Sequence, residues 1–322
     1  MENVKKITDY DSFITNVVGG LSEYLTNNGL KTMVLGVSGG IDSTVTAAIC
    51  NLVTKATNIP LIGLSLPCSS NKEDEISSAL LTCKEFLNEY KEVNLQEAFS
   101  YMEGVLEVTS GLKSTNISQG NVKARLRMMA LYDLASKRNG IVIGTSNLSE
   151  WFTGFWTLHG DVGDINPIGE LWKTQVYELA KHLKSNVFKD SKALELAMNI
   201  LPTDGNGTSN TDMEQIMPNH TYMDIDRILK AWVNLSPKIK PMYAADGFTD
   251  SIKNTVFDTE DENVRNRRIE ACKKSGIEFV PTLGDLYDVD LVRRVLKRSW
   301  NTEYKRISKE LCVATNGKII SH

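Results

Sequence analysis

Residues 36–43 read Gly-Val-Ser-Gly-Gly-Ile-Asp-Ser and follow directly on the apolar run Thr32-Met33-Val34-Leu35. Glycines carry no Cβ and let the backbone approach an anion closely. The helix predicted after the octet would point its free N–H groups at the turn, so the octet predicts a phosphate cradle between a strand and a helix. The common nucleotide loop has a lysine after its last glycine, whereas this octet has Asp42. A carboxylate beside phosphates needs a cation between them, so the octet also predicts Mg²⁺.

Working outward from the octet, short apolar runs alternate with helical patterns, which predicts an α/β fold with a doubly wound parallel sheet flanked by helices. Ligands of such sheets bind beyond the carboxyl ends of the strands, where both the octet and Thr145 lie. Buried strands are predicted at 31–37, 60–66 and 140–145, with a weaker strand at 91–95. Helical spacing of apolar residues is found at 11–26, 45–53, 73–87, 96–108, 117–137, 174–183 and 192–200.

The chain beyond residue 150 is less regular. Glycine and aspartate are frequent in 151–170, which indicates a functional loop, and the polar stretch 202–220 predicts a mobile loop. Helical patterns recur at 223–232 and 262–274, and 285–322 predicts one or two more helices. No linker divides the chain. We expect one domain over 1–275, followed by a C-terminal extension, 276–322, to which the sequence assigns no role.

The composition is that of a globular protein, with 41% hydrophobic and 24% charged residues. A net charge of −4 argues against a general nucleic-acid binder. No apolar run approaches the roughly 20 residues of a membrane span, and no apolar segment of a secretory signal follows the N-terminus. Five cysteines without a Cys-x-x-Cys pair indicate a reducing compartment. We therefore expect a cytoplasmic protein without nucleic-acid or membrane partners.

Two acids at neighbouring strand ends are candidate metal ligands. Asp42 alone is explained equally well as a first-turn acid favoured by the helix dipole, but a cap does not require the flanking Ser-Gly-Gly and Ser43. Glu150 follows the predicted strand 140–145 and, alone, fits the acid of a capping box. Their joint position favours a metal site, because two carboxylates and phosphate oxygens form a typical Mg²⁺ environment.

The predicted helix 117–137 carries three cations, Lys123, Arg125 and Arg127. Helical geometry places Arg125 on one flank of the apolar stripe and the other two on the opposite flank, without showing which flank meets a ligand. For each cation taken singly, a solvated basic face is the favoured interpretation. The stripe expected to face the core consists of Val122, Leu126, Met129 and Ala130.

Taken together, these segments resemble ammonia-dependent NAD⁺ synthetase, within the N-type ATP pyrophosphatases. The octet is similar to the Ser-Gly-Gly-x-Asp-Ser PP-loop of that superfamily, which also includes GMP synthetase and tRNA-lysidine synthetase. Residues 120–127 resemble the family's Asn-x-x-x-Arg-x-Arg helix. The motifs occur in the family's order over about residues 10–275. Its central signature is matched by 144–150, Thr153-Gly154-Phe155, Gly160-Asp161, Asp164-Ile-Asn-Pro-Ile and Lys173.

The resemblance implies a Rossmann-like fold and a ligase that forms a carbon–nitrogen bond. ATP adenylates the nicotinate carboxylate of deamido-NAD⁺ with release of pyrophosphate, and ammonia then attacks to give NAD⁺ and AMP. By position it implies Mg²⁺ ligation by Asp42 and Glu150, and contacts to deamido-NAD⁺ by Arg125, Asp164 and Lys273. The implied catalytic residues are Asp42, Glu150, Asp164 and Lys173. The implied ATP contacts are Gly36, Val37, Ser38, Gly39, Gly40, Ile41, Asp42, Ser43, Thr145, Lys173 and Thr203.

The chain departs from the family pattern at four places. Leu158, followed by His159, stands where the family has a lysine, and the Gly-Asp loop after it is one residue shorter than in the family. Ser65 replaces an arginine at the end of the predicted strand 60–66. Cys272-Lys273-Lys274 stands where the family's substrate tail has His-Lys-Arg. All of these departures lie outside the PP-loop.

The resemblance also implies a homodimer, with Phe152, Phe155 and Trp156 contributing to the interface, although core packing explains these aromatics equally well. About thirty residues precede the first strand, too few for a glutamine amidase domain, so we expect free ammonia or a separate glutaminase as nitrogen source. Two alternatives remain at this stage. One is another N-type pyrophosphatase that amidates or thiolates a different acceptor, and the other is a nucleotide-binding regulator deficient in turnover.

Overall fold

The computed structural model describes residues 7, 9–161, 163–203, 205–209, 211–233, 270, 273–274, 289–306, 311–313 and 319–321. Internal contacts divide the chain into two compact units. The first, here called the α/β unit, comprises Ile7–Leu148 and Trp156–Asn219. The second, the C-terminal unit, comprises Ser149–Phe155 and the described residues of His220–His322. The expected division of the chain at residue 275 stays a prediction.

The α/β unit is built on a four-stranded parallel sheet, which confirms the predicted fold class. Its strands are β1 (Thr32–Gly36), β2 (Leu61–Ser65), β3 (Glu89–Glu92) and β4 (Gly140–Ile143), in the order β3-β2-β1-β4. Strand β3 begins two residues before the expected 91–95. It is an exposed edge strand of sequence Glu-Tyr-Lys-Glu, so no apolar run marks its position.

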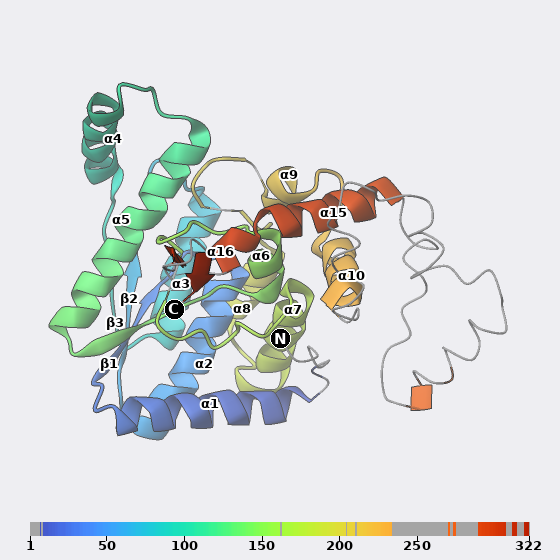
Figure 1. Cartoon of the computed structure of the whole chain (residues 1–322). Coiled ribbons are helices and arrows are strands. Elements are labelled where there is room, and N and C mark those ends of the chain that lie inside the picture. The colour runs from blue at the N-terminus through green and yellow to red at the C-terminus, as the bar shows by residue number, and fades with distance from the viewer. Residues whose placement is uncertain are drawn as a thin grey trace. The chain divides into compact units, whose positions relative to one another are not determined.

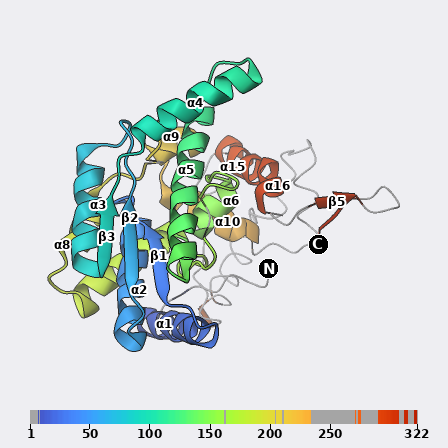
Figure 2. The ribbon, with the colours of Figure 1, turned by 90° about the vertical axis from the view of Figure 1, so that its left-hand side faces the viewer.

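Helices cover both faces of this sheet, as Figure 2 shows with α5 on one side of the strands and α3 and α8 on the other. The alternation of strand side chains explains the two layers: Met33 and Leu35 join the larger core, whereas Val34 packs with Leu131 and Ala135 of α5. The larger core is formed with α1 (Tyr10–Asn27), α2 (Ile41–Thr57), α3 (Glu73–Phe86), α7 (Lys173–His182) and α8 (Lys192–Asn199). The opposite face carries α5 (Asn116–Lys137), against which α4 (Gln96–Ser110) packs (Figure 1).

Helix boundaries in this unit follow local signals. The carboxylate of Asp9 accepts a hydrogen bond from the backbone N–H of Ser12 at 3.0 Å and caps α1. Gly29, at φ +65°, ends the same helix in the left-handed conformation. Helix α7 continues into a single π-type turn over Leu183–Val187, and α9 (Asp212–Ile216) lies inside the polar stretch that was expected to be a loop.

The C-terminal unit contains helices that the sequence pattern predicted and a hairpin that it did not. Helix α10 (Tyr222–Val233) packs against α15 (Val289–Asn301), which is followed by α16 (Glu303–Arg306) (Figure 1). Strands β5 (Leu311–Val313) and β6 (Ile319–Ser321) pair antiparallel. The expected helix 262–274 lies mostly outside the described residues. Helix α6 (Leu148–Thr153) begins at the last residue of the first α/β segment and continues into this unit.

The apolar periodicity of α15 explains its packing. Leu291, Val292, Val295 and Leu296 are buried at helical spacing, while Arg294 and Lys297 of the same helix are exposed. No helix among the described residues is long and apolar enough to cross a membrane.

Candidate functional site

The octet forms a tight turn between β1 and α2. Gly39 adopts φ +85°, and a Cβ at this position would lie 2.1 Å from the carbonyl oxygen of Glu75. Gly40 is the N-cap of α2, and its N–H donates to Ser38 Oγ at 3.3 Å. Ser38 Oγ and Ser43 Oγ lie 3.1 Å apart, within hydrogen-bonding distance. The turn thus leaves the first N–H groups of α2 without intrahelical partners, which is the geometry of an anion cradle.

The first turns of α3 support this loop from behind. Ser78 Oγ donates to the carbonyl oxygen of Gly39 at 2.8 Å. The carboxylate of Glu75 is buried, and it accepts hydrogen bonds from Thr203 Oγ1 and from Asn71 Nδ2 at 3.1 Å. Glu75 thereby links the loop that carries Thr203 to the back of the octet. Sequence reasoning missed Glu75, although an acid in the first turn of a predicted helix is a recognisable capping signal.

Asp42 does not cap α2 but turns its carboxylate toward two other segments. It accepts a hydrogen bond from Asn147 Nδ2 at 2.9 Å and forms an ion pair with Lys173 Nζ, whose side chain is only 3% exposed. Asn147 follows β4, and Lys173 is the first residue of α7. Because β1 and β4 are hydrogen-bonded neighbours, with Leu35 opposite Ile143, the two strand ends meet as predicted.

The ion pair shapes the local electrostatics. A lysine buried without its acid would be an uncompensated charge in a poorly solvated place, so Asp42 and Lys173 stabilise each other. Tyr177, one turn along α7 from Lys173, has its pKa raised by burial, with Asp42 raising it further and Lys173 opposing. The site therefore holds a carboxylate, Asp42, and an ammonium group, Lys173, beside the octet.

The donor set fits a magnesium ion that draws most of its ligands from a substrate. A carboxylate offers about four acceptor positions, and Asp42 uses two of them for Asn147 and Lys173. Among the residues that the structure describes, no group of three or more acidic, histidine or cysteine side chains is arranged to hold a metal. Mg²⁺ usually takes one or two carboxylates together with phosphate oxygens and water. Glu150, the other expected ligand, is half-buried in the first turn of α6, in the C-terminal unit.

Two cations of α5 are not on a solvated basic face, and that interpretation is wrong for Lys123 and Arg127. Lys123 is 7% exposed, and its Nζ donates to Ser70 Oγ at 3.0 Å and to the carbonyl oxygen of Asn206 at 2.8 Å. Met129, expected in the core, is 58% exposed. The buried residues of α5 include Leu126 of the predicted stripe together with Gly120, Lys123 and Ala124, and the segment that contains Asn206 and Thr208 approaches the helix at Gly120.

Arg127 ties two loops to α5. Its Nε donates to the carbonyl oxygen of Leu66 at 3.0 Å, and Nη1 donates to Asn206 Oδ1 at 2.6 Å. Nη2 donates to Asn71 Oδ1 at 3.1 Å and to the carbonyl oxygen of Gly205 at 3.2 Å. The segment around 205–206, expected to belong to a mobile loop, is therefore fastened to the helix. Thr203 lies in the same segment, so Arg127 also stabilises the position of a predicted ATP contact.

Arg125 and Asp164, two of the residues expected to contact deamido-NAD⁺, have hydrogen-bond partners outside this network. Arg125 is exposed, and its Nη2 donates to the carbonyl oxygen of Leu158 at 3.2 Å. The Asp164 carboxylate accepts from the backbone N–H of Val142 at 2.9 Å and from the Tyr132 hydroxyl at 3.1 Å. Burial, together with the charge of Asp164, raises the pKa of Tyr132 to about 12. The proposed substrate roles of Arg125 and Asp164 stay predictions.

The remaining expected residues occupy distinct places. Thr145 is half-buried directly after β4, and Lys273 is exposed in the C-terminal unit. Phe152 is buried, which for this residue fits the core-packing explanation. Lys273-Lys274 was expected to be the basic pair of the substrate tail, but a second basic dipeptide, Lys305-Arg306, donates to backbone carbonyls of 151–154. The Lys-Arg sequence itself was the signal that could have identified it.

Comparison with known proteins shows which family the chain resembles. The family model described as NAD synthase matches residues 13–270. The NH₃-dependent NAD⁺ synthetase of Wolinella succinogenes is 32% identical over 69% of this chain and 84% of its own length. That of Helicobacter hepaticus is 30% identical over 91% of this chain and 95% of its own. The structure of NMN synthetase from Francisella tularensis superposes with a TM-score of 0.60 at 33% identity, covering 72% of this chain and 90% of that one.

The family match spans the octet, the Asp42–Lys173 pair and the α5 cations, and two relatives align over more than four-fifths of their length. The chain belongs to the NAD synthase family.

Proposed function

We propose that this chain is an ammonia-dependent NAD⁺ synthetase. It adenylates the nicotinate carboxylate of deamido-NAD⁺ with ATP, and ammonia then displaces AMP to give the amide. The observation that carries this proposal is the octet, with Asp42 held by Asn147 and Lys173 at the ends of two adjacent parallel strands. This places a carboxylate and a cation beside an anion cradle, as ATP cleavage requires.

We infer separate roles in ATP cleavage for the octet, Lys173 and the two acids. Ser38, Gly39, Gly40 and Ser43, with the N–H groups of α2, hold the departing pyrophosphate, whose growing charge they stabilise. Lys173 adds positive charge that is already oriented by Asp42. Asp42 and Glu150 would hold Mg²⁺, which when bound would neutralise phosphate oxygens. No covalent protein nucleophile is needed, because a carboxylate activated as its adenylate is attacked directly by ammonia.

The acceptor half rests on Arg125, Lys273 and Asp164. Arg125 and Lys273 provide positive charge for the dinucleotide. The carboxylate of Asp164 is oriented by Val142 and Tyr132, so it can accept a hydrogen bond from ammonia without first reorganising. Positioning of this kind supplies much of the rate in a reaction between two bound partners.

A second candidate is amidation of nicotinate mononucleotide, because the Francisella tularensis relative is an NMN synthetase and is 33% identical over 90% of its length. Both reactions form the same amide bond and would use the same ATP half of the site. They differ in whether the adenylate portion of the dinucleotide is bound. The departures at Leu158 and Cys272 fall in the part of the chain that the resemblance assigns to the dinucleotide.

The purified chain, supplied with ATP, Mg²⁺ and ammonium, is expected to convert deamido-NAD⁺ to NAD⁺ with stoichiometric AMP. We expect kcat/KM to exceed that for nicotinate mononucleotide by about tenfold or more, a difference of about 1.4 kcal/mol. Chromatographic quantification of NAD⁺, NMN and AMP in parallel reactions measures both. A preference for the mononucleotide would establish the second candidate. AMP and pyrophosphate formation only with some other acceptor would refute both.

We further propose that the chain forms a homodimer through α4. Tyr101, Val105 and Val108 lie on one stripe of this helix at i, i+4 and i+7, and Leu112 follows just after the helix ends. Tyr101, Val108 and Leu112 are each more than 70% exposed. An apolar stripe of this kind on one helix supports an association surface.

The free, buried Cys50, Cys68 and Cys83 support a location in the reducing cytoplasm.

Replacing both Tyr101 and Val108 with glutamate is expected to convert the dimer to a monomer, because two charges would have to be buried without partners at the interface. Light scattering coupled to size-exclusion chromatography measures the mass of the particle. The matched control is Val187→Glu, an exposed valine on the π-type turn after α7. An unchanged mass for the double variant would show that α4 is not the interface.

A further inference from the structure

Helix α6 carries Glu150 and is only six residues long. Its end is a Schellman motif: Gly154 adopts φ +63°, the N–H of Phe155 donates to the carbonyl oxygen of Glu150 at 3.0 Å, and the N–H of Gly154 donates to that of Trp151 at 3.3 Å. Of the last four carbonyl groups of the helix, which have no donor partner in the regular helical pattern, the motif satisfies those of Glu150 and Trp151 and leaves those of Phe152 and Thr153. Its orientation therefore depends on other parts of the chain.

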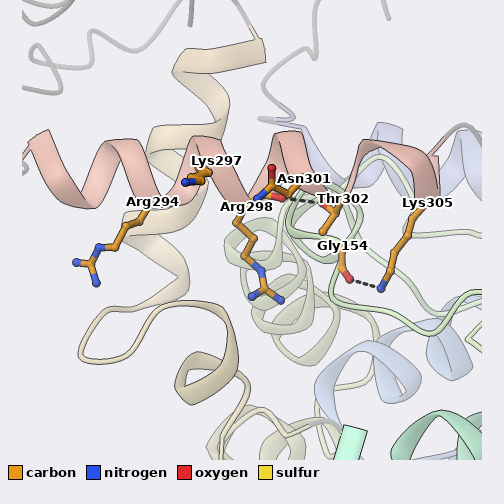
Figure 3. Close-up of a pocket in the computed structure, with 7 residues that line it drawn as sticks. All are labelled: Gly154, Arg294, Lys297, Arg298, Asn301, Thr302 and Lys305. Atoms are coloured by element: carbon orange, nitrogen blue, oxygen red, sulfur yellow. Dashed lines mark hydrogen bonds between the residues drawn. The ribbon is translucent and has the colours of Figure 1, made fainter. Parts of the chain in front are cut away.

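Three cations of α15 and α16 supply those donors. Arg298 Nε donates to the carbonyl oxygen of Thr153 at 2.9 Å, and Lys305 Nζ donates to that of Gly154 at 2.8 Å. Arg306 Nη1 donates to the carbonyl oxygen of Phe152 at 3.0 Å. Figure 3 shows the side chains of Arg298, from α15, and Lys305, from α16, extending to the side on which Gly154 lies, with the hydrogen bond between Lys305 and Gly154 dashed. Positive side chains at a helix C-terminus are also favoured by the helix dipole.

The contact between residues 152–154 and helices α15 and α16 also includes close van der Waals packing. A Cβ at position 154 would lie 2.3 Å from Cβ of Thr302, so only glycine admits this approach. The guanidinium group of Arg306 lies over the Phe152 ring at 5.8 Å and also donates to Thr302 Oγ1 at 3.2 Å. Burial lowers the pKa of Arg298. Burying the Arg298 guanidinium group has a desolvation cost, which a cation facing the solvent would not have. The hydrogen bonds to the carbonyl groups of α6 offset this cost.

The other end of α6 is fixed too. Ser149 Oγ donates to Asp226 Oδ1 of α10, and both residues are fully buried. Glu150 therefore lies between two held points of the backbone. Residue 149 before it is bonded to α10, and residues 152–154 after it are bonded to the three cations of α15 and α16. Helices α15 and α16 lie after residue 270, where the match to the family model ends.

We propose that α15–α16 act as a clamp on α6, and that Arg298, Lys305 and Arg306 are positioning residues that fix the backbone of the helix that carries Glu150, a proposed ligand of the metal ion. The proposal rests on the assignment of Glu150 as a ligand in the proposed function. It gives the C-terminal segment a role that its sequence alone did not. Residues that orient metal ligands typically change metal affinity by about 10- to 100-fold when they are removed.

Helix α15 provides a matched pair of arginines for the test. Arg298 contacts α6, whereas Arg294, one turn earlier, is exposed and its Nε donates to the carbonyl oxygen of Asp290 on its own helix. The experiment compares Arg298→Ala, Arg298→Lys and Arg294→Ala in the full chain. Hydrogen exchange of the 149–155 backbone reports on the clamp without requiring catalysis. Electron paramagnetic resonance of Mn²⁺ in the presence of ATP reports on metal affinity without an acceptor substrate.

We expect Arg298→Ala to speed exchange in 149–155 and to weaken Mn²⁺ binding by about tenfold or more. Arg298→Lys, which keeps a positive donor, should remain within about threefold of the parent chain, and Arg294→Ala should match the parent. Lys305→Met is the second variant if Arg298→Ala does not fold, with Lys297→Met as its control. Faster exchange with unchanged Mn²⁺ affinity, or equal effects of the Arg298 and Arg294 variants, would overturn the proposal.

Failure of the proposed function is distinguishable from failure of the clamp. Absence of NAD⁺ formation by the parent chain refutes the function, while exchange and Mn²⁺ binding still report on the clamp. If Glu150→Gln binds Mn²⁺ as tightly as the parent chain, Glu150 is not a ligand and the clamp does not serve the metal.

Discussion

Replacing Asp42 with asparagine is expected to lower kcat/KM for NAD⁺ formation by a factor on the order of 10²–10³, the scale seen when one charge-stabilising group is removed from an active site. The same change removes the acid that pairs with the buried Lys173. An uncompensated buried charge costs roughly 3–5 kcal/mol, although the partial exposure of Asp42 reduces this toward the lower end. Thermal unfolding and the NAD⁺ assay measure the two effects separately.

The double variant Asp42→Asn, Lys173→Met separates stability from activity. It removes both charges at once, and replacing a buried ion pair with neutral groups is often neutral for stability. We therefore expect the melting temperature to return close to that of the parent chain while NAD⁺ formation stays lost. Recovery of activity in the double variant, or parent-like rates in Asp42→Asn, would contradict the assignment of Asp42 to the metal and phosphate site.

The octet and the strands beside it were predictable because each depends on local sequence. An apolar run followed by Gly, Ser and Asp gives a strand, a turn and a helix start within a dozen residues. The adjacency of β1 and β4 then follows from the doubly wound arrangement. The place where Asp42 meets β4 was predictable for the same reason.

The partners of these residues were not predictable, because they come from remote parts of the chain. Lys173 lies 131 positions after Asp42, and sequence reasoning assigned both to ATP, and Asp42 also to Mg²⁺, but did not pair them with each other. Lys123 and Arg127 were misjudged because a helical pattern treats cations as solvent-facing. A cation whose stem lies along the helix can instead donate to the backbone of an arriving loop, as Arg127 does to Leu66 and Gly205.

Arg298 of α15 is a further residue whose partner could not be predicted from the local sequence. Its apolar stripe predicted a helix in 285–322, and that helix is present. What Arg298 does depends on the segment 151–154, which is more than 140 residues away and has no distinctive periodicity. Thr153-Gly154-Phe155 was recognised as part of a signature. The physical need for glycine there became clear only from its left-handed conformation and its contact with Thr302.

The second large effect is expected at Gly39. An alanine there would have to adopt φ +85° and place its Cβ 2.1 Å from the carbonyl oxygen of Glu75. Left-handed backbone alone costs a non-glycine residue about 1–2 kcal/mol. The overlap cannot be relieved by a side-chain rotation, because the opposing atom belongs to the backbone of α3. We expect Gly39→Ala to lower the free energy of unfolding by about 3 kcal/mol or more.

The neighbouring glycine is the matched control for stability. Gly40 has φ −73°, and the nearest atom to a Cβ at this position is Ser38 Oγ at 3.5 Å, an ordinary contact. Gly40→Ala should therefore change the free energy of unfolding by less than about 1 kcal/mol, as measured by denaturant titration of both variants. Equal stabilities would show that the octet can move away from α3. In that case Glu75 and Ser78 would not hold the phosphate loop in place, and the proposed role of α3 in supporting the site would be wrong.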